Sequence, residues 1–335
     1  MTSANPYVTI ALRRFLLLAV LLGGTTCPAI AAGPGIAFPA KIVTLVVPFP
    51  PGGVVDIIGR LLADKLGTQL GAKVIVENRP GAGGTLGATY VARAAPDGYT
   101  LLLGGAATHV FSPLIYPNIS YDPVKSFAPV IQLTSGPLVL VVPQGAAVTT
   151  FREFQDLVSQ EGERLNYSSN GPGTFPHLAA ELYRQATGTK FTHVPYSGGS
   201  KAVLALLSNE VGFSINHIPN VNSLVKSGKL KALATTGRNR AASFPELPTF
   251  AEAGIPGFET SAWFGLFAPA GTPIAVIAKL NAEAAIALSS PDLRSKLALQ
   301  GDEPVGGSPE NMAAYVRAEL AKWPAVVKAA KITAE

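Results

Sequence analysis

Residues 45–70 read LVVPFPPGGVVDIIGRLLADKLGTQL, which predicts a buried strand, a turn rich in proline and glycine, and an amphipathic helix. The apolar run at 45–47 is short and ends at Pro48, as expected for a strand covered on both faces of an α/β sheet. From Val54 to Leu66 apolar residues recur at helical spacing, so we expect one helix face to pack on that sheet.

The turn itself, FPPGG at 49–53, is a candidate anion site. Backbone N–H groups at a helix N-terminus lack partners, and the helix dipole attracts negative charge there. A carboxylate or phosphate could bind at this point, and a tight turn without a ligand is an equally good interpretation. Asp56 in the first turn is most easily a partner of the helix dipole, with ligand contact as the alternative.

The chain continues with alternating strand and helix patterns as far as residue 103, which favours βαβ units and a mostly parallel sheet. The glycine-rich turn at 78–87 resembles a dinucleotide loop, but Leu86 stands where the third glycine belongs, so we expect no NAD or FAD. Small residues at 104–108 follow the next strand and leave room for a ligand, whereas His109 is expected to be structural.

Two apolar runs at 130–137 and 138–142, broken by Gly-Pro, are predicted as strands that cross between two lobes, and the chain returns near 261–267. Between these crossings the first pattern repeats, because a strand at 165–169 and a Gly-Pro turn precede a helix at 175–186. Thr174 is the predicted N-cap. Two helix N-termini, one from each lobe, are thus expected to face one anion.

Composition excludes several classes of protein. The 335 residues are 48% apolar and 14% charged, which predicts a globular chain of two domains or one bilobed unit. The formal charge of +5 becomes +3 once Arg13 and Arg14 are removed with the leader described next. No Lys/Arg cluster remains, so we expect no nucleic-acid partner.

Residues 1–31 have the pattern of a secretory signal peptide, with Arg13-Arg14, an apolar core and a small-residue site before Ala32. The core is too short for a permanent membrane anchor. Cys27 is the only cysteine and lies in a poor lipoprotein context, so a mature chain without cysteine is expected in the periplasm.

Catalytic patterns are missing from the sequence. It contains no nucleophile elbow, zinc-protease motif or phosphate-binding loop, and its histidines, at 109, 177, 193 and 217, show no metal-binding spacing. His177 lies in the first turn of its predicted helix, where a neutral ring or a side chain that caps the helix is the usual interpretation. Tyr196 is most simply a half-buried aromatic residue at the end of a strand. A secreted hydrolase that uses His109 or His177 with a serine is kept as an alternative.

Eight motifs in order along the chain resemble the substrate-binding proteins of tripartite tricarboxylate transporters, the Bordetella-uptake-gene type. They include PFPPGGVVDIIGRLLADKL at 48–66, VENRPGAGGTLGA at 76–88, NYSSNGPGTFPHLAAELY at 166–183 and SAWFGLFAPAGTP at 261–273. The resemblance implies a type II periplasmic binding protein, an α/β fold whose two lobes close on a small carboxylated ligand without catalysis or cofactor. It also implies a hinge between lobe 1, residues 38–135 and 262–335, and lobe 2, residues 136–261.

Carried over to matching positions, the resemblance implies ligand contacts from the turns of both lobes. The expected contacts are Phe49, Gly52, Gly53, Asp56, Ala106, Ala107, Thr108, Ser169, Asn170, Gly171, Thr174, His177, Tyr196 and Asn216. Asn216 stands where the family often has an aspartate. A neutral side chain there favours a plain mono- or dicarboxylate over an amino acid.

The expected partners are the carboxylate and the membrane subunits of a transporter, with a receptor kinase as the alternative, and the chain is expected to be a monomer because closure needs free lobes.

Overall fold

The opening stretch forms strand β1 (Val43–Val47), a turn and helix α2 (Val54–Leu70), as predicted. These bounds come from a computed structural model that describes residues 38–116 and 118–332. Leu45, Val46 and Val47 are fully buried, and the inner face of α2 adds Ile58, Leu62 and Leu66. The apolar periodicity of the sequence thus places α2 on the sheet.

β1 lies between two parallel neighbours, with Leu45 opposite Val76 of β2 (Val74–Asn78) and Leu101 of β3 (Thr100–Gly105). Short helical elements connect these strands and follow β3. They are η1 (Ala82–Gly84), α3 (Thr85–Ala92), the π-helical turn η2 (Ala107–Phe111) and α4 (Ser112–Ile115).

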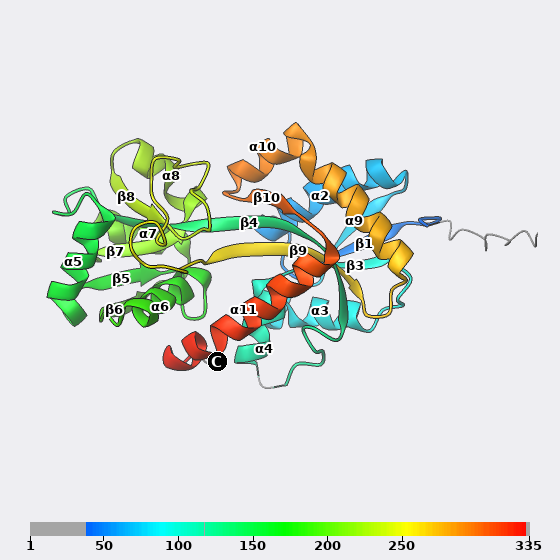
Figure 1. Cartoon of the computed structure of the whole chain (residues 1–335), viewed down its shortest axis with the longest axis horizontal. Coiled ribbons are helices and arrows are strands. Elements are labelled where there is room, and N and C mark those ends of the chain that lie inside the picture. Colours follow the sequence, from blue (N-terminus) through cyan, green and yellow to red (C-terminus); the bar gives the residue numbers. More distant parts are fainter. Residues whose placement is uncertain (1–37, 117, 333–335) are drawn as a thin grey trace, which may run out of the picture. The chain divides into compact units, whose positions relative to one another are not determined.

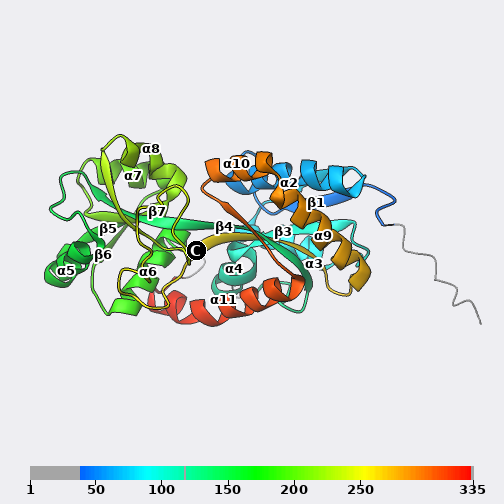
Figure 2. The ribbon, with the colours of Figure 1, turned by 45° about the horizontal axis from the view of Figure 1, so that its top comes forward.

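Two long antiparallel strands, β4 (Phe127–Pro143) and β9 (Ser261–Pro269), connect the two halves of the fold (Figures 1 and 2). The prediction of two strands broken by Gly-Pro is wrong, because β4 is continuous through Gly136 and Pro137. Pro137 is the last residue of β4 that pairs with β9, and from Leu138 onward β4 pairs with β7 and β8. The missing N–H of Pro137 therefore falls where the partner strand changes.

Beyond that change lies the second lobe, formed by the end of β4 and by the elements between β4 and β9. They are α5 (Phe151–Glu161), η3 (Gly162–Arg164), β5 (Asn166–Ser169), α6 (Phe175–Thr187), β6 (Thr192–Pro195), α7 (Gly199–Leu207), β7 (Phe213–His217), α8 (Ile218–Lys226) and β8 (Leu230–Thr235). β5 runs parallel to β6 and β7. The strand order across both lobes is β2-β1-β3-β9-β4-β7-β5-β6, with β8 and β10 also paired to β4.

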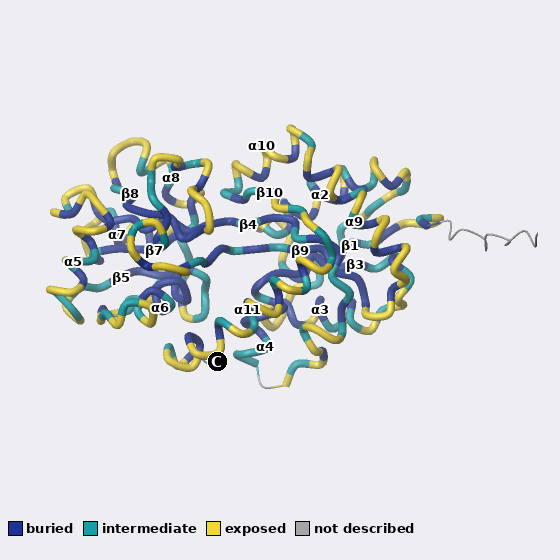
Figure 3. The backbone as a smooth tube through the Cα atoms, in the orientation of Figure 1, coloured by how far each residue is buried: buried dark blue, intermediate teal, exposed yellow. Residues whose placement is uncertain are grey.

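After β9 the chain returns to the first lobe, and the end of its last helix also packs on α6 of the second lobe. The last elements are α9 (Ile274–Ser289), α10 (Pro291–Leu299), β10 (Glu303–Gly306) and α11 (Pro309–Ala329). β10 pairs with β4, and Trp323 of α11 is buried in one core cluster with Trp263 of β9 and Leu178 of α6. Both lobes belong to one compact unit, Pro39–Glu335, and the crossing strands are buried along most of their length (Figure 3).

Within residues 38–116 and 118–332, no single helix is long and apolar enough to cross a membrane, and only α9 and α10 together, bent by 75°, reach that length and composition. The predicted signal peptide at 1–31, with Cys27, lies outside the described residues.

Candidate functional site

The turn between β1 and α2 exposes its backbone at the start of the helix. Gly52 has a φ of +82°, a conformation that glycine adopts without strain. Gly53 occupies the N-cap position of α2 and has no side chain to cap the first turn. The first N–H groups of the helix, from Val54 onward, therefore have no partner within it. This end of α2 presents hydrogen-bond donors and the positive end of the helix dipole.

Asp56 holds this turn in place. Its carboxylate is buried, and Oδ2 accepts hydrogen bonds from the Gly52 N–H and from Arg60 Nε, both at 2.9 Å. Oδ1 accepts one from Asn78 Nδ2 at 2.9 Å. The hydrogen bond from Arg60 lowers the pKa of Asp56 to about 2, although burial acts in the opposite direction. Asp56 thus shapes the turn in addition to facing the helix dipole, and the Gly52 N–H is already engaged.

Phe49 and Thr108 meet across Gly84. A Cβ on Gly84 would lie 2.9 Å from Thr108 Cγ2 and 3.3 Å from Phe49 Cζ. Thr108 is fully buried, and its hydroxyl accepts a hydrogen bond from the Gly105 N–H at 3.0 Å. The glycine-rich turn therefore lets its backbone pass close to these two side chains, which agrees with the structural interpretation of its glycines.

Small residues follow β3. Ala106 is buried and Ala107 is half-buried at the start of η2. His109 is fully buried and stacks on Phe267, with ring centroids 3.9 Å apart. Burial lowers the pKa of His109 to about 3. Its neutral ring is part of the core, in agreement with a structural role.

In the second lobe, the hydroxyls of the predicted site bond within the protein. Ser169 Oγ lies 2.7 Å from His193 Nε2 and accepts a hydrogen bond from the Gly171 N–H at 3.1 Å. Thr174 occupies the predicted N-cap position of α6, but its hydroxyl donates to the Gly171 carbonyl at 2.7 Å and caps no N–H of the helix. In this structure the Ser169 and Thr174 hydroxyls thus have partners within the second lobe, and their contact with a ligand stays a prediction.

His177 closes the same turn from inside α6. Its Nδ1 accepts a hydrogen bond from the Gly173 N–H at 3.0 Å. Its ring stacks on the ring of His193, with the two ring centroids 4.1 Å apart. Burial lowers the pKa of His177 to about 3 and that of His193 to about 4. The interpretation of His177 as a neutral ring that caps a turn agrees with this geometry.

Three asparagine side chains gather near the start of α7. Asn170 Oδ1 is buried without a hydrogen-bond partner, and a Cβ on Gly199 would lie 3.4 Å from Asn170 Nδ2 and 2.8 Å from Asn220 Nδ2. Asn216 is fully buried, and its Oδ1 accepts hydrogen bonds from the His217 N–H at 2.8 Å and from Asn220 Nδ2 at 3.0 Å. Asn216 therefore positions Asn220, whereas Asn170 keeps an unused acceptor.

Tyr196 is half-buried after β6, as predicted for a strand-end aromatic. Its N–H donates to the Ser169 carbonyl at 3.1 Å, and its hydroxyl donates to Glu210 Oε1 at 2.7 Å. The side chain is thus held by the second lobe itself.

A cavity of about 270 Å³ lies beside these turns and is bounded by both lobes. The first lobe contributes Val54, Ala262, Phe264 and residues 300–302, and the second contributes residues 217–220; Gly136 and Pro137 of β4 lie between them. The fourteen predicted contacts, all of them within the described residues, do not line this cavity. Two of them adjoin it, because Gly53 precedes Val54 and Asn216 holds Asn220, whereas His177 lines a different pocket beside the end of α11.

The two lobes touch at one edge of the cavity. Gly301 has a φ of +73°, and a Cβ there would lie only 2.5 Å from Pro219 Cδ. Gly301 of the first lobe thus packs directly on α8 of the second.

Comparisons with known proteins agree with this two-lobed arrangement. Residues 58–332 match the family model described as "Tripartite tricarboxylate transporter family receptor". The chain belongs to this receptor family.

The receptor is 35% identical to protein BugT of Bordetella pertussis over 87% of this chain and 90% of that protein. Among solved structures, it is similar to Rpa4515 of R. palustris with adipate, at a TM-score of 0.71 and 38% identity, covering 88% of this chain and 99% of that one. MatC of Rhodopseudomonas palustris with bound malate gives a TM-score of 0.67 and 37% identity, covering 87% of this chain and all of that one. Periplasmic binding protein BugD gives a TM-score of 0.68 and 33% identity, covering 89% of this chain and all of that one, so the fold is that of a periplasmic binding protein, as predicted.

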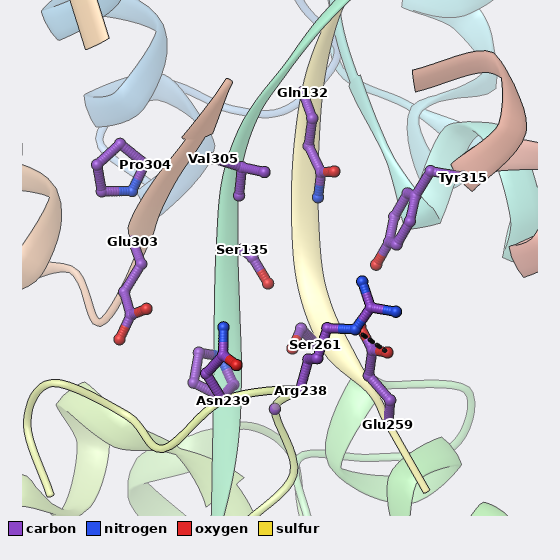
Figure 4. Close-up of a pocket in the computed structure, with 12 residues that line it drawn as sticks. Gln132, Ser135, Arg238, Asn239, Glu259, Ser261, Glu303, Pro304, Val305 and Tyr315 are labelled. Carbon is purple, nitrogen blue, oxygen red and sulfur yellow. Dashed lines mark ion pairs between the residues drawn. The ribbon is translucent and has the colours of Figure 1, made fainter. Parts of the chain in front are cut away.

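The receptor has a second pocket, of about 340 Å³, against β4, β9 and β10 (Figure 4). Its lining includes Gln132, Ser135, Arg238, Glu259, Glu303 and Tyr315. Arg238 lies 3.9 Å from the Glu259 carboxylate and Glu303 adds a second acid, so this pocket does not favour an anion.

Sequence reasoning missed the residues that line the cavity between the lobes. Asn220 and Asp302 are isolated polar residues beside helix ends, a position that has many structural explanations. The contact between Gly301 and Pro219 brings them together, and no local pattern encodes it. The acid that follows Gly301 is the only local signal for this part of the cavity.

Proposed function

We propose that this receptor captures a small carboxylate between its two lobes in the periplasm and delivers it to the membrane subunits of a tripartite tricarboxylate-type transporter. The observation that carries the proposal is the membership in the receptor family, together with a cavity bounded by both lobes beside the unpartnered N-terminus of α2. The relatives with adipate and malate support a dicarboxylate as the ligand.

In this proposal the ligand carboxylate accepts hydrogen bonds from the backbone at the start of α2. The Gly52 N–H is held by Asp56, so the donors are the N–H groups of Gly53, Val54 and Val55. From the second lobe, the available side-chain groups are those of Asn170 and Asn220. The remaining predicted residues shape these turns through the hydrogen bonds described above.

We further propose that the receptor binds without turnover. Ser169 and His193 form a close pair, but Ser169 is fully buried and donates or accepts within its own turn. No carboxylate contact orients His193 among its hydrogen bonds and ring contacts in the described residues. A nucleophile needs access to its substrate and an oriented base, so this pair supports the turn and not hydrolysis.

The predicted lobe limits, cleavage of residues 1–31 and a monomeric state complete the proposal. Closure about β4 and β9 requires that both lobes are free to move, which a monomer allows.

The test is a ligand screen on residues 32–335, unfolded and refolded to remove carried-over ligand. A ligand at about 100 times its Kd adds about 2.7 kcal/mol of stability, which raises the Tm by several degrees in a chain of this size. We expect such a shift with one class of di- or monocarboxylates. A natively refolded protein that shows no shift with any carboxylate contradicts the proposal.

Val54→Pro separates the proposed backbone contact from general packing. Proline is well tolerated at the first position of a helix, and the extended Gly53, at φ −80° and ψ 169°, suits a residue before proline. The variant should fold and lose roughly 10- to 100-fold in affinity, because one charge-assisted hydrogen bond is removed. Val54→Ala, which keeps the N–H, and Ile274→Pro, at the same position of α9, are the matched controls.

A further inference from the structure

Asp302 is a buried carboxyl that the fold does not use. It follows Gly301 between α10 and β10, and only 4% of it is exposed. Its Oδ1 has no partner within 3.5 Å, and the one side chain that acts on it as a hydrogen-bond donor is the Thr134 hydroxyl, which has no other partner. Gly136 of β4 accommodates it, since a Cβ there would lie 3.0 Å from Asp302 Oδ1. Desolvation raises the pKa of Asp302 to about 7.

The carboxyl lies in the lining of the cavity between the lobes. No lysine or arginine is among the residues that line this cavity, and the other titratable group is His217, whose pKa burial lowers to about 4. The remaining lining is mostly apolar, with Val54, Phe264 and Pro219 as examples. An acid here therefore has neither an ion-pair partner nor bulk water.

A purely structural role explains Asp302 poorly. Burying a carboxyl without a partner costs free energy, whereas a small apolar residue at the same place would cost little. Buried ionisable groups without partners in a cavity are characteristic of functional sites. The cavity that Asp302 lines also contains Val54, the first residue of α2, so both ends of one small ligand can lie within it.

We propose that Asp302 is a specificity-determining residue, which accepts a hydrogen bond from a donor group on the carboxylate ligand. This inference rests on the proposed function, in which α2 binds the ligand carboxylate. The ligand class is then a carboxylate, the proposed dicarboxylate included, that also carries a hydroxyl or an amine, because such a group can donate to the Asp302 carboxylate. The plain carboxylate expected from Asn216 is revised accordingly, since Asp302 supplies from the first lobe an acid that position 216 lacks.

The test compares matched ligands by titration calorimetry at pH 8 on the refolded residues 32–335. One set is succinate, malate and aspartate, and the other is glutarate, 2-hydroxyglutarate and glutamate. We expect the donor-bearing member of a set to bind roughly 10- to 100-fold more tightly than the plain acid. The preference for malate or for aspartate shows whether the donor is a hydroxyl or an amine.

Variants assign this preference to the carboxyl. Asp302→Ala should remove the preference for the donor-bearing member of each set. Asp302→Asn, which preserves size and one acceptor oxygen, should reduce this preference less. An unchanged preference in Asp302→Ala overturns the inference. Equal affinity of the wild-type protein for all members of a set overturns the inference alone, whereas no binding of any carboxylate overturns the proposed function as well.

Discussion

Replacing Asp302 by asparagine should stabilise the ligand-free receptor, and the gain should depend on pH. The folded protein raises the pKa of Asp302 from 3.8 to about 7 through desolvation. The folded state therefore binds the proton more tightly than the unfolded state. The neutral carboxyl is tolerated in the folded state, so its contribution to the unfolding free energy is fully present below about pH 4. This contribution is lost as pH rises through 7, because the carboxyl then ionises inside the folded protein.

The size of the effect follows from the shift. Each pKa unit corresponds to about 1.36 kcal/mol, so a rise from 3.8 to about 7 gives an upper limit of about 4 kcal/mol at pH 8. Asparagine has nearly the same shape and does not ionise. The difference in unfolding free energy between Asp302→Asn and the wild type should rise between pH 4 and pH 8, toward this limit.

Denaturant unfolding at five pH values from 4 to 8 measures this difference. Asp64→Asn, which makes the same change at a side chain that is 77% exposed, is the control for the substitution itself. A difference for Asp302→Asn that does not change with pH would show that Asp302 is ionised or solvated in both states. Such a result would refute the assignment of Asp302 as a buried carboxyl without an ion-pair partner.

Two further substitutions test the turn and the lobe contact. Asp56→Asn should lower the unfolding free energy by about 1–3 kcal/mol at pH 7, because it weakens the hydrogen bond from the Gly52 N–H. The pKa of Asp56 is lowered to about 2, so this loss of stability should fade as pH falls from about 4 toward 2. Denaturant unfolding measures it. Gly301→Ala should lower ligand affinity by more than tenfold in calorimetry, because the new Cβ would displace Pro219. The control is Gly254→Ala, which should leave affinity unchanged, since Gly254 also has a positive φ but has open space around it.

Much of the fold was predictable because it depends on local periodicity. The apolar spacing from Val54 to Leu66 predicted the helix that the structure shows as α2, and alternating strands and helices predicted the parallel pairing of β1 with β2 and β3. The expectation of a mostly parallel sheet is wrong for the sheet as a whole, because β4 and β9 pair antiparallel with all their neighbours. The break expected at Gly136 and Pro137 failed for a tertiary reason. The residue without an N–H falls where β4 changes partners, so the strand continues.

The site was predictable at the level of turns and not of atoms. The sequence located both turns, but some of the side chains that hold them come from distant positions. Asn78 at the end of β2 donates to Asp56, and the Ser169 hydroxyl pairs with His193 of the next strand. The cavity depends on a contact between Gly301 and Pro219 that no local pattern specifies, which is why Asp302 was not among the expected residues.

The central claim is that a ligand carboxylate is held by the backbone at the start of α2, between the lobes. A crystal structure of residues 32–335 with the tightest carboxylate from the screen tests it most directly. We expect carboxylate oxygens within hydrogen-bond distance of the Gly53 to Val55 N–H groups, with a second-lobe residue in contact with the same ligand. A carboxylate bound to Arg238 in the pocket of Figure 4, with the start of α2 free, would contradict the account.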